Sequence, residues 1–298
     1  MPAVTLFSPA KINLFLAIVG RRVDGFHDLL SVAAPLAWGD TLIAETNTKQ
    51  RVELECDDPS LPTDESNLVV RAANLFRERT GWSSGLSFSL QKRIPQGAGL
   101  GGGSSNASTA LLALNRLAGL PLQPIELAEL AARLGSDCPL FLEDGPVVMR
   151  GRGERLEPLP TGAVSRLRGR RLLVFKPSFG VPTPWAYRRL AESRPSRYLP
   201  SDEAEARLAH WIANPRLPVE DLLYNTFETV AFEKFVALPT LLEILSTRFD
   251  LKGSMSGSGS ACFAFLPERR DPDREDAIRK AIREAWGDDC FLVETAHR

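Results

Sequence analysis

The chain has 298 residues, of which 44% are hydrophobic and 24% charged, and its formal net charge is −1. This composition excludes a disordered, collagen-like or coiled-coil protein, and the balanced charge gives no reason to expect nucleic acid or a membrane as a partner. At roughly 150 residues per domain, the length predicts two domains.

Nothing in the sequence predicts a membrane span or a secretory signal. The apolar run 12–19 is too short to cross a bilayer, and Arg21 and Arg22 follow that run instead of preceding it. Because the histidines are scattered and the cysteines widely spaced, neither metal ligands nor disulfides are expected. We expect a cytoplasmic protein with reduced thiols at Cys56, Cys138, Cys262 and Cys290.

The first half of the chain alternates strand and helix patterns. The helices predicted here each end at a glycine, namely Gly81, Gly119 and Gly135. Their predicted ranges are 67–80, 104–118 and 125–134. Strands are predicted at 4–7, 11–19, 41–46, 51–56, 86–92, 146–149 and 154–159.

Residues 160–171 lack apolar periodicity and carry four arginines, which predicts a solvated linker. Helix and strand patterns mix on both sides of it, so the sequence predicts an α+β fold with domains at 1–160 and 171–298. In the second half, strands are predicted at 172–175, 262–266 and 291–294, and helices at 183–193, 202–212, 225–235, 238–247 and 274–285.

The clearest chemical motif is PQGAGLGGGSSN at 95–106, between a predicted strand and a predicted helix. Five glycines within seven positions let the backbone turn tightly and bring amide groups against a ligand without interference from Cβ atoms. Ser104 and Ser105 are placed to cap the helix, whose N-terminus favours an anion. The segment therefore predicts a phosphate-binding loop.

Two better-known phosphate loops fit this segment less well. Gly97, Gly99 and Gly102 satisfy G-x-G-x-x-G, but a dinucleotide-binding unit needs a second strand ending in an acidic residue, where this chain has another helix. A Walker A loop needs a lysine where Gly103 stands. A plain glycine hinge is the remaining alternative.

Three further places carry polar residues that could act on a ligand. Lys11 and Asn13 lie in a strand whose two faces are otherwise apolar, so Lys11 should contact an anion unless its ammonium reaches water. Asp137 follows a helix end, where it either stabilises a turn or acts on a ligand. The late loop GSMSGSGS at 253–260 is either a plain turn or a second set of amides for the same ligand.

Together these motifs resemble the three signatures of the GHMP kinase superfamily, in the same order. The matching segments are SPAKINLFL at 8–16, GLGGGSS at 99–105 and MSGSGS at 255–260, and the resemblance spans almost the whole chain. It implies an N-terminal domain like the second domain of ribosomal protein S5 and a ferredoxin-like C-terminal domain. Three more segments are similar to a branch of the family that acts on a cytidine diphosphate conjugate: GRRVDGFHDL at 20–29, LGSDCPLFL at 134–142 and PTPWAY at 182–187.

The resemblance also implies residue roles, in which Lys11 and Asp137 match the catalytic pair. ATP is expected near Asn67 and along the glycine loop, at Pro95, Gly97, Ala98, Gly99, Leu100, Gly101, Gly102, Gly103, Ser104 and Ser105. The substrate is expected to contact Asn13, Phe26, His27, Asp137, Thr183, Tyr187, Gly257 and Ser258.

Within that set, His27 matches the residue that hydrogen-bonds cytosine, and Phe26 and Tyr187 match the aromatic platforms around the base. Many relatives carry tyrosine where this chain has Phe26. A contact that requires the hydroxyl would be lost, whereas the ring face needed for stacking stays.

The implied reaction is transfer of the γ-phosphoryl group of ATP, with Mg²⁺ accompanying it, to the 2-hydroxyl of a cytidine diphosphate conjugate of methylerythritol, in non-mevalonate isoprenoid synthesis. The expected assembly is a monomer or weak homodimer. A kinase of homoserine or mevalonate is the nearest alternative, but those substrates carry no base. A nicotinamide-dependent oxidoreductase would explain the glycines but not Lys11, Asp137 or the late loop, and a catalytically silent binding protein would need neither Lys11 nor Asp137.

Overall fold

The computed structural model describes residues 2–193 and 196–298. The chain forms two compact units, and neither is a continuous stretch of sequence. The first unit contains the chain up to Ala10 together with Trp38–Pro95 and Gly101–Asp144, and the second contains Lys11–Ala37, Gln96–Leu100 and Gly145–Arg298. Strands β1 (Ala3–Arg21) and β2 (His27–Asn47) contribute residues to both. The division at 160–171 expected from the sequence stays a prediction.

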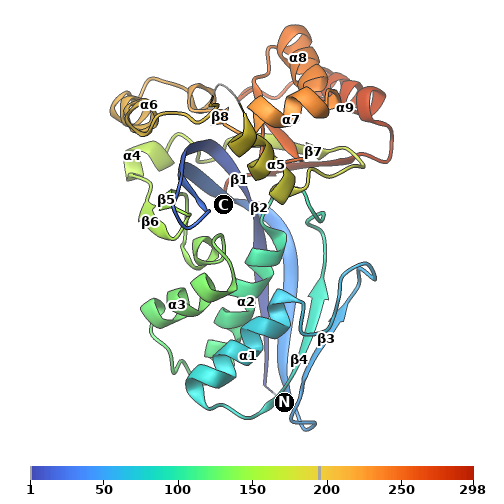
Figure 1. Ribbon diagram of the computed structural model, residues 1–298. Coiled ribbons are helices and arrows are strands. Elements are labelled where there is room, and N and C mark those ends of the chain that lie inside the picture. The colour runs from blue at the N-terminus through green and yellow to red at the C-terminus, as the bar shows by residue number, and fades with distance from the viewer. Residues whose placement is uncertain (1, 194–195) are drawn as a thin grey trace. The chain divides into compact units, whose positions relative to one another are not determined.

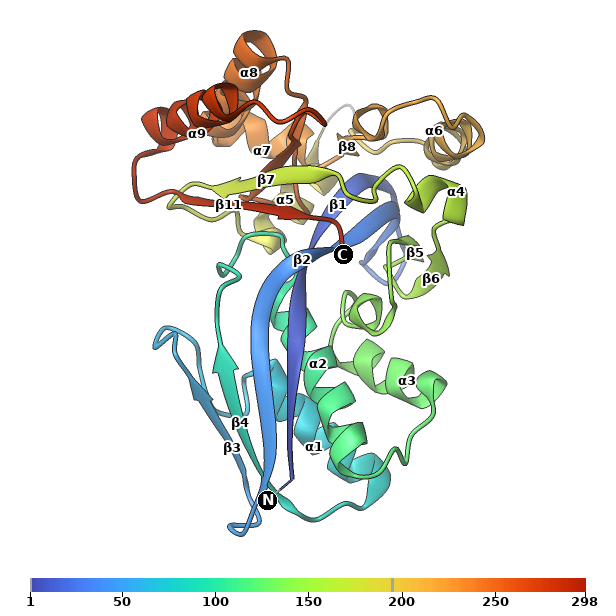
Figure 2. The same cartoon turned by 180° about the vertical axis from the view of Figure 1, so that it is seen from behind.

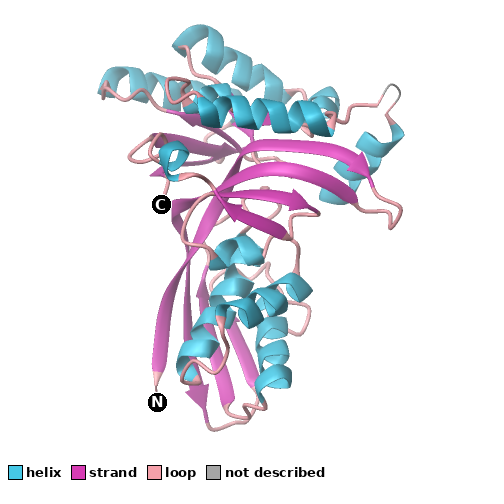
Figure 3. Cartoon of the chain, turned by 90° about the vertical axis from the view of Figure 1, so that its left-hand side faces the viewer, coloured by secondary structure: helices cyan, strands magenta, loops and turns pink. Residues whose placement is uncertain are grey.

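In the first unit, three helices cover one face of the strands β3-β4-β2-β1 (Figures 1 and 3). Strand β4 (Gly85–Gln91) pairs antiparallel with β2 and parallel with β3 (Val52–Cys56). The alanines of α2, such as Ala107 and Ala110, are fully buried, and their small side chains allow close packing against α1. The helices are α1 (Leu68–Thr80), α2 (Gly102–Leu117) and α3 (Pro124–Leu134), followed by a short turn of 3₁₀ helix, η1 (Pro139–Leu142).

The second unit contains an antiparallel sheet in the order β11-β7-β10-β9, with helices on one face (Figures 1 and 2). Its strands are β7 (Arg171–Lys176), β9 (Gly253–Met255), β10 (Cys262–Phe265) and β11 (Phe291–Ala296). Alternate residues of β7 and β10, among them Phe175 and Ala264, pack with apolar side chains of four helices. These helices are α5 (Thr183–Glu192), α7 (Glu228–Lys234), α8 (Ala237–Phe249) and α9 (Pro272–Trp286).

The rest of the second unit is built around β1 and β2. Strand β5 (Val147–Gly151) pairs with β2, β6 (Arg155–Pro158) pairs with β5, and β8 (Tyr224–Asn225) runs parallel to β1. The remaining elements are α4 (Thr161–Val164), α6 (Ser201–Ala213) and the 3₁₀ turn η2 (Val219–Asp221).

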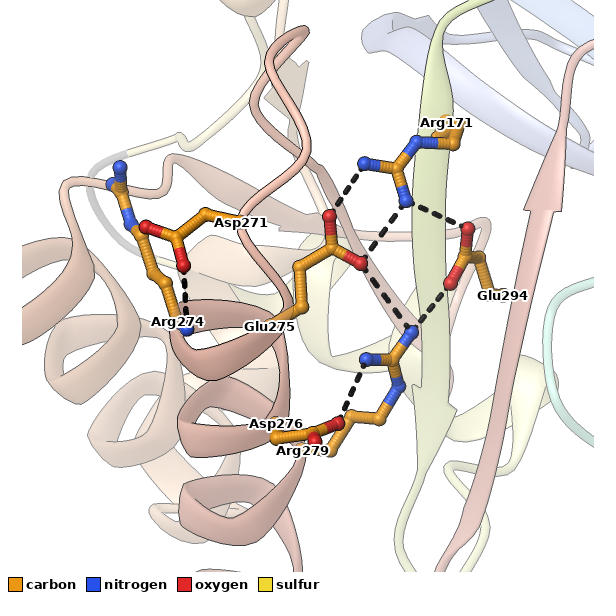
Figure 4. A network of polar contacts seen from close by, with 7 residues as sticks. All are labelled: Arg171, Asp271, Arg274, Glu275, Asp276, Arg279 and Glu294. Carbon is orange, nitrogen blue, oxygen red and sulfur yellow. Dashed lines mark hydrogen bonds and ion pairs between the residues drawn. The ribbon is translucent and has the colours of Figure 1, made fainter.

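An ion-pair network joins α9 to β7 and β11 (Figure 4). Arg171 on β7 donates to Glu275 of α9 at 2.5 Å and to Glu294 of β11 at 2.9 Å. Arg279, one turn after Glu275 on α9, pairs with Glu294 as well. The hydrogen bond that Glu275 accepts from the Arg171 guanidinium lowers the pKa of Glu275.

The predicted helices of the first half are confirmed to within two residues, but the strand prediction was wrong at the N-terminus. The strands predicted at 4–7 and 11–19 are one strand, β1, and β2 begins at His27, well before the predicted start at 41. Pro35 and Gly39 interrupt the strand pattern there. Gly39 is required by a close approach, because a Cβ at that position would lie 2.1 Å from the carbonyl oxygen of Ser8.

The solvated linker predicted at 160–171 was also wrong. The guanidinium carbon of Arg166 lies 3.5 Å from the ring centroid of Trp211, and the same side chain donates to the Trp211 carbonyl at 3.0 Å. Arg170 pairs with Glu220. The helix predicted at 225–235 begins only at Glu228, because Tyr224–Asn225 forms β8.

Candidate active site

In the second unit, Lys11 occupies a buried position on β1. The residue is only 3% exposed, and its ammonium donates to Oδ1 of Asn13 at 2.6 Å. Asn13 donates in turn to the hydroxyl of Ser31 at 2.9 Å, and Ser31 donates to the carbonyl of Phe15 at 2.7 Å. This chain of donors fixes the Asn13 amide with its oxygen toward the ammonium.

The two glycine loops meet beside this lysine. The backbone amide of Lys11 donates to the carbonyl of Leu100 at 3.0 Å, and the amide of Ala261 donates to the carbonyl of Ala98 at 3.1 Å. Gly257 has φ +57, and a Cβ on it would lie 3.0 Å from the Gly99 carbonyl oxygen and 3.3 Å from the Lys11 ammonium. The late loop is therefore packed against the early loop and against Lys11, and is more than a plain turn.

Two polar residues that the sequence reasoning missed anchor the late loop. The amide nitrogen of Asn225, a residue 2% exposed, donates to the carbonyls of Met255 and Gly257 at 2.7 and 2.8 Å. A carboxylate oxygen of Glu228 accepts from the Met255 amide and the Ser254 hydroxyl, both at 2.7 Å. Burial raises the pKa of Glu228. In the sequence, Asn225 is a single polar residue after Leu222-Leu223-Tyr224, and nothing in that pattern indicates that it holds the late loop.

The aromatic residues expected around a base lie on several elements of the second unit. The His27 ring lies 4.9 Å from the Tyr187 ring at 34°, and Tyr187 packs edge-on against Phe227 at 4.8 Å. Phe26 is 53% exposed, with the guanidinium carbon of Arg152 4.6 Å from its ring centroid. His27 and Tyr187 thus form one cluster, and Phe26 offers an accessible ring.

Thr183 and Ser258, two further expected substrate contacts, are also neighbours. Their hydroxyl oxygens lie 2.7 Å apart, which joins the start of α5 to the late loop. In the same unit, the ammonium of the buried Lys176 donates to the carbonyls of Pro177 and Phe179 at 2.9 and 3.1 Å. Burial lowers the pKa of Lys176.

In the first unit, the glycine loop continues into α2. Gly101 is the N-cap, with φ 72, and no side chain caps the helix, so the expectation that Ser104 and Ser105 cap it was wrong. The helix begins two residues earlier than predicted, which places both serines inside its first turn; the Ser105 hydroxyl lies 2.8 Å from that of Ser8. The first amides of α2 have no acceptor within the helix, as an anion site at this end requires.

A buried carboxylate, Asp40, fixes the strand end before the glycine loop and was missed from the sequence. Asp40 is 0% exposed, and it accepts from the backbone amides of Arg93 and Ile94 at 2.7 and 2.8 Å. It also pairs with Lys92 and accepts from the Asn106 amide at 2.8 Å. Asn106 lies on α2, so this network ties the strand end to the helix.

Asp137 and Asn67 lie in the first unit as well. Asp137 stands in the turn after α3, where the Cys138 amide donates to Gly135 at 3.1 Å and the Ser108 hydroxyl of α2 donates to the Cys138 carbonyl at 2.6 Å. Burial raises the pKa of the Cys138 thiol to about 11, so it is not a nucleophile. Asn67 is the N-cap of α1, since its side chain accepts from the Val69 amide at 2.9 Å.

Within residues 2–193 and 196–298, no three His, Cys, Asp or Glu side chains are grouped to hold a metal ion. None of the helices described there is both long and apolar enough to cross a membrane. All four cysteines are free thiols.

Known proteins match this chain along most of its length. The family of GHMP kinases N terminal domains matches residues 67–145, and the family of GHMP kinases C terminal domains matches 213–288. A 4-diphosphocytidyl-2-C-methyl-D-erythritol kinase of Prochlorococcus marinus (strain MIT 9303) is 41% identical over 294 residues, covering 95% of this chain and 89% of that protein.

Two solved structures have a similar fold. The crystal structure of a 4-(cytidine 5'-diphospho)-2C-methyl-D-erythritol kinase is 35% identical, with a TM-score of 0.76 over 99% of this chain and 100% of that chain. A homoserine kinase from Cytophaga hutchinsonii has a TM-score of 0.73 but only 17% identity, over 99% of this chain and 95% of that chain, so it shows the shared fold alone.

The chain belongs to the GHMP kinase family. It is an ATP-dependent kinase with the α+β, two-domain fold of that family, as the sequence motifs predicted.

Proposed function

We propose that this kinase phosphorylates the 2-hydroxyl of 4-diphosphocytidyl-2-C-methyl-D-erythritol, a step of non-mevalonate isoprenoid synthesis. The observation that carries the kinase chemistry is the meeting of Lys11, Gly99 and Gly257, where a Cβ on Gly257 would lie 3.3 Å from the ammonium. The names of the relatives and the cluster of His27 with Tyr187 support a substrate that carries a base.

The proposed roles follow from charge. Phosphoryl transfer passes through a loose transition state, so positioning and electrostatic stabilisation supply most of the acceleration. Asp137 orients the acceptor hydroxyl and accepts its proton, the hydroxyl oxygen bonds to the γ-phosphorus, and the bond from that phosphorus to the bridging oxygen breaks, which releases ADP. Lys11 stabilises the negative charge that develops on the transferred group.

The glycine loop from Gly97 to Ser105 is proposed to bind the ATP phosphates through main-chain amides. Positions in it can accommodate them: a Cβ on Gly97 would have no neighbour within 4 Å, and one on Gly103 would meet only Leu68, at 3.7 Å. Mg²⁺ held by the phosphates would neutralise charge there, and the proposal assigns it no protein ligand. Adenine contact near Asn67 remains part of the proposal.

Asn13, Phe26, His27, Thr183, Tyr187, Gly257 and Ser258 are proposed as substrate contacts. A cytoplasmic location belongs to the same proposal, because the reaction consumes ATP and the cysteines are free thiols. A monomer or weak homodimer is the proposed assembly, which light scattering of the purified protein tests.

A coupled ADP-release assay tests the substrate directly. The cytidylated methylerythritol should be turned over with a kcat/KM at least about a thousandfold above that of homoserine or mevalonate, because neither of those carries groups for a base-binding site. Comparable turnover of homoserine would overturn the proposal.

A further inference from the structure

The imidazole of His27 has a second partner that none of the family motifs contains. Nε2 of His27 lies 3.2 Å from the hydroxyl of Tyr198, and the two rings meet edge-on at 5.8 Å and 65°. The contact of the ring with Tyr187 is tilted, at 34°, with the centroids 4.9 Å apart. His27 is therefore held both by a ring face and by a hydrogen bond at one nitrogen.

The segment that carries Tyr198 is itself fixed on both sides. The amide of Leu199 donates to the carbonyl of Ile18 on β1 at 3.1 Å, and Leu199 is 7% exposed. Arg197 pairs with Glu233 of α7 at 2.5 Å. The hydroxyl thus comes from an anchored stretch of chain.

A histidine with one nitrogen engaged offers only the other to a ligand. Since Nε2 faces Tyr198, the atom of His27 that remains is Nδ1. In a neutral imidazole one nitrogen carries the proton and the other a lone pair, so the partner of Nε2 decides whether Nδ1 donates or accepts. The Nε2–H form is the intrinsically preferred neutral tautomer, and a phenol oxygen is a suitable acceptor for it.

We propose that Tyr198 is a positioning residue that accepts a hydrogen bond from Nε2–H of His27 and thereby leaves a lone pair on Nδ1 to accept from the exocyclic amino group of cytosine. The same lone pair faces the oxo group of uracil unfavourably, because both are acceptors. Tyr198 in this way contributes to the choice of base without touching it. The contact with cytosine rests on the proposed function, whereas the tautomer of His27 does not depend on it.

The state of the ring agrees with this geometry. Burial lowers the pKa of His27, and the nearby charge of Arg21 lowers it further. A lowered pKa favours the uncharged imidazole, which keeps the lone pair that the proposal requires.

The first test is spectroscopic and needs no substrate. The chain contains only three histidines, so ¹⁵N–¹H correlation spectra are simple, and the His27→Gln variant assigns the signals of His27. The native protein should show His27 as a single neutral tautomer protonated at Nε2. In Tyr198→Phe, the nitrogen shifts should move toward the average of two tautomers. A native Nδ1–H tautomer, or unchanged shifts in Tyr198→Phe, would overturn the inference.

The second test is kinetic and uses cytidine and uridine diphosphate conjugates of methylerythritol. Tyr198→Phe should lower the cytidine-to-uridine ratio of kcat/KM by about tenfold, the size of one hydrogen bond. The KM for ATP and the kcat at saturating cytidine substrate should stay within about twofold.

Tyr224→Phe is the matched control, since it removes one hydroxyl from a ring that packs on Phe15 at 5.5 Å instead of on His27. An equal loss of discrimination in Tyr224→Phe, or a uniform fall of kcat with both bases in Tyr198→Phe, would show a merely structural role and overturn the inference. A native protein inactive on the cytidine conjugate would defeat the proposed function, while the spectra still decide the role of Tyr198.

Discussion

The hydroxyl of Ser256 donates a hydrogen bond to the carbonyl oxygen of Gly99 at 3.0 Å. This contact joins the late loop to the early glycine loop within the second unit. It also leaves no space for a side chain at position 99, because a Cβ there would lie 2.0 Å from the carbonyl oxygen of Ser256. The separation of the two loops is therefore set by the backbone, and substitutions can test whether the kinase depends on it.

Replacing Gly99 by alanine should separate the loops. Gly99 and Gly97 both have positive φ, +75 and +59, so alanine at either costs about 1–2 kcal/mol in strain. Only Gly99→Ala also produces a clash. Steady-state kinetics should show kcat/KM for ATP falling about a hundredfold in Gly99→Ala, since small displacements are costly in a positioned site, and less than about tenfold in Gly97→Ala. Equal losses would mean that loop separation does not limit activity.

Asn225→Asp should release the late loop. The new carboxylate still accepts from the Phe227 amide, as Asn225 does at 2.9 Å, but it cannot donate to the Met255 and Gly257 carbonyls. A buried charge facing two carbonyl oxygens should lower the free energy of unfolding by about 3 kcal/mol, measured in urea. Asn74→Asp, on an exposed position of α1, is the control and should change it by less than about 0.5 kcal/mol.

Asp40→Asn tests the anchor of the strand end in the first unit. The oxygen that accepts from Asn106 and pairs with Lys92 would become an amide nitrogen facing two donors, or the amide would flip and face the Arg93 and Ile94 amides. The free energy of unfolding should fall by about 3–5 kcal/mol, and the KM for ATP should rise. Adding Lys92→Met removes the unpaired ammonium and should restore part of the stability. A double variant no more stable than Asp40→Asn would contradict this pairing.

Asp137→Asn should lower kcat by about a hundredfold to ten-thousandfold if the carboxylate accepts the hydroxyl proton. The thermal midpoint of the variant, measured alongside, separates a loss of catalysis from a loss of folded protein. Asp144→Asn, an exposed carboxylate shortly after η1, serves as the control in the same assay at saturating substrates. Near-normal turnover by Asp137→Asn would remove its role as a base.

The ion-pair network of Figure 4 should make the free energy of unfolding depend on pH in the acidic range. The hydrogen bond from Arg171 keeps the folded-state pKa of Glu275 below its unfolded value, although burial acts in the opposite direction. The unfolded chain therefore binds a proton more readily. The stabilisation is therefore complete above the unfolded pKa and is lost as pH falls through the folded pKa. In urea titrations between about pH 5 and pH 3, Glu275→Gln should lose less stability on acidification than the native protein.

Glu284→Gln is the matched control for that titration, because Glu284 lies on the same helix with only a 3.8 Å pair to Lys280. Its acid dependence should follow the native protein. If Glu275→Gln does so too, the network does not couple stability to pH.

Local signals were sufficient to predict most helices. Helix α1 was predicted from its apolar spacing and from Gly81, and the structure places Gly81 as a left-handed C-cap with Asn67 as the N-cap. Such caps are contained within a few adjacent residues, so they can be recognised in the sequence. The glycine loop was recognisable for the same reason.

Contacts between distant segments could not be predicted in this way. Asp40 accepts from the Arg93 amide, 53 residues away in the sequence, and the Tyr198 hydroxyl contacts His27, which is 171 residues away. Arg166 looked like a surface charge until the fold placed Trp211 beside it. In each case the polar residue has an ordinary local sequence, and only the folded chain brings its partner to it.

Because β1 and β2 supply backbone to both units, neither unit can be isolated as one continuous stretch of the chain. A fragment of residues 171–298 would leave β8 without the strand it pairs with at Phe15 and Leu16, and it would lack the lysine that the late loop packs against. Exchanging one unit between two relatives would therefore mean exchanging interleaved segments, with crossovers that include positions inside β1, inside β2 and within the glycine loop.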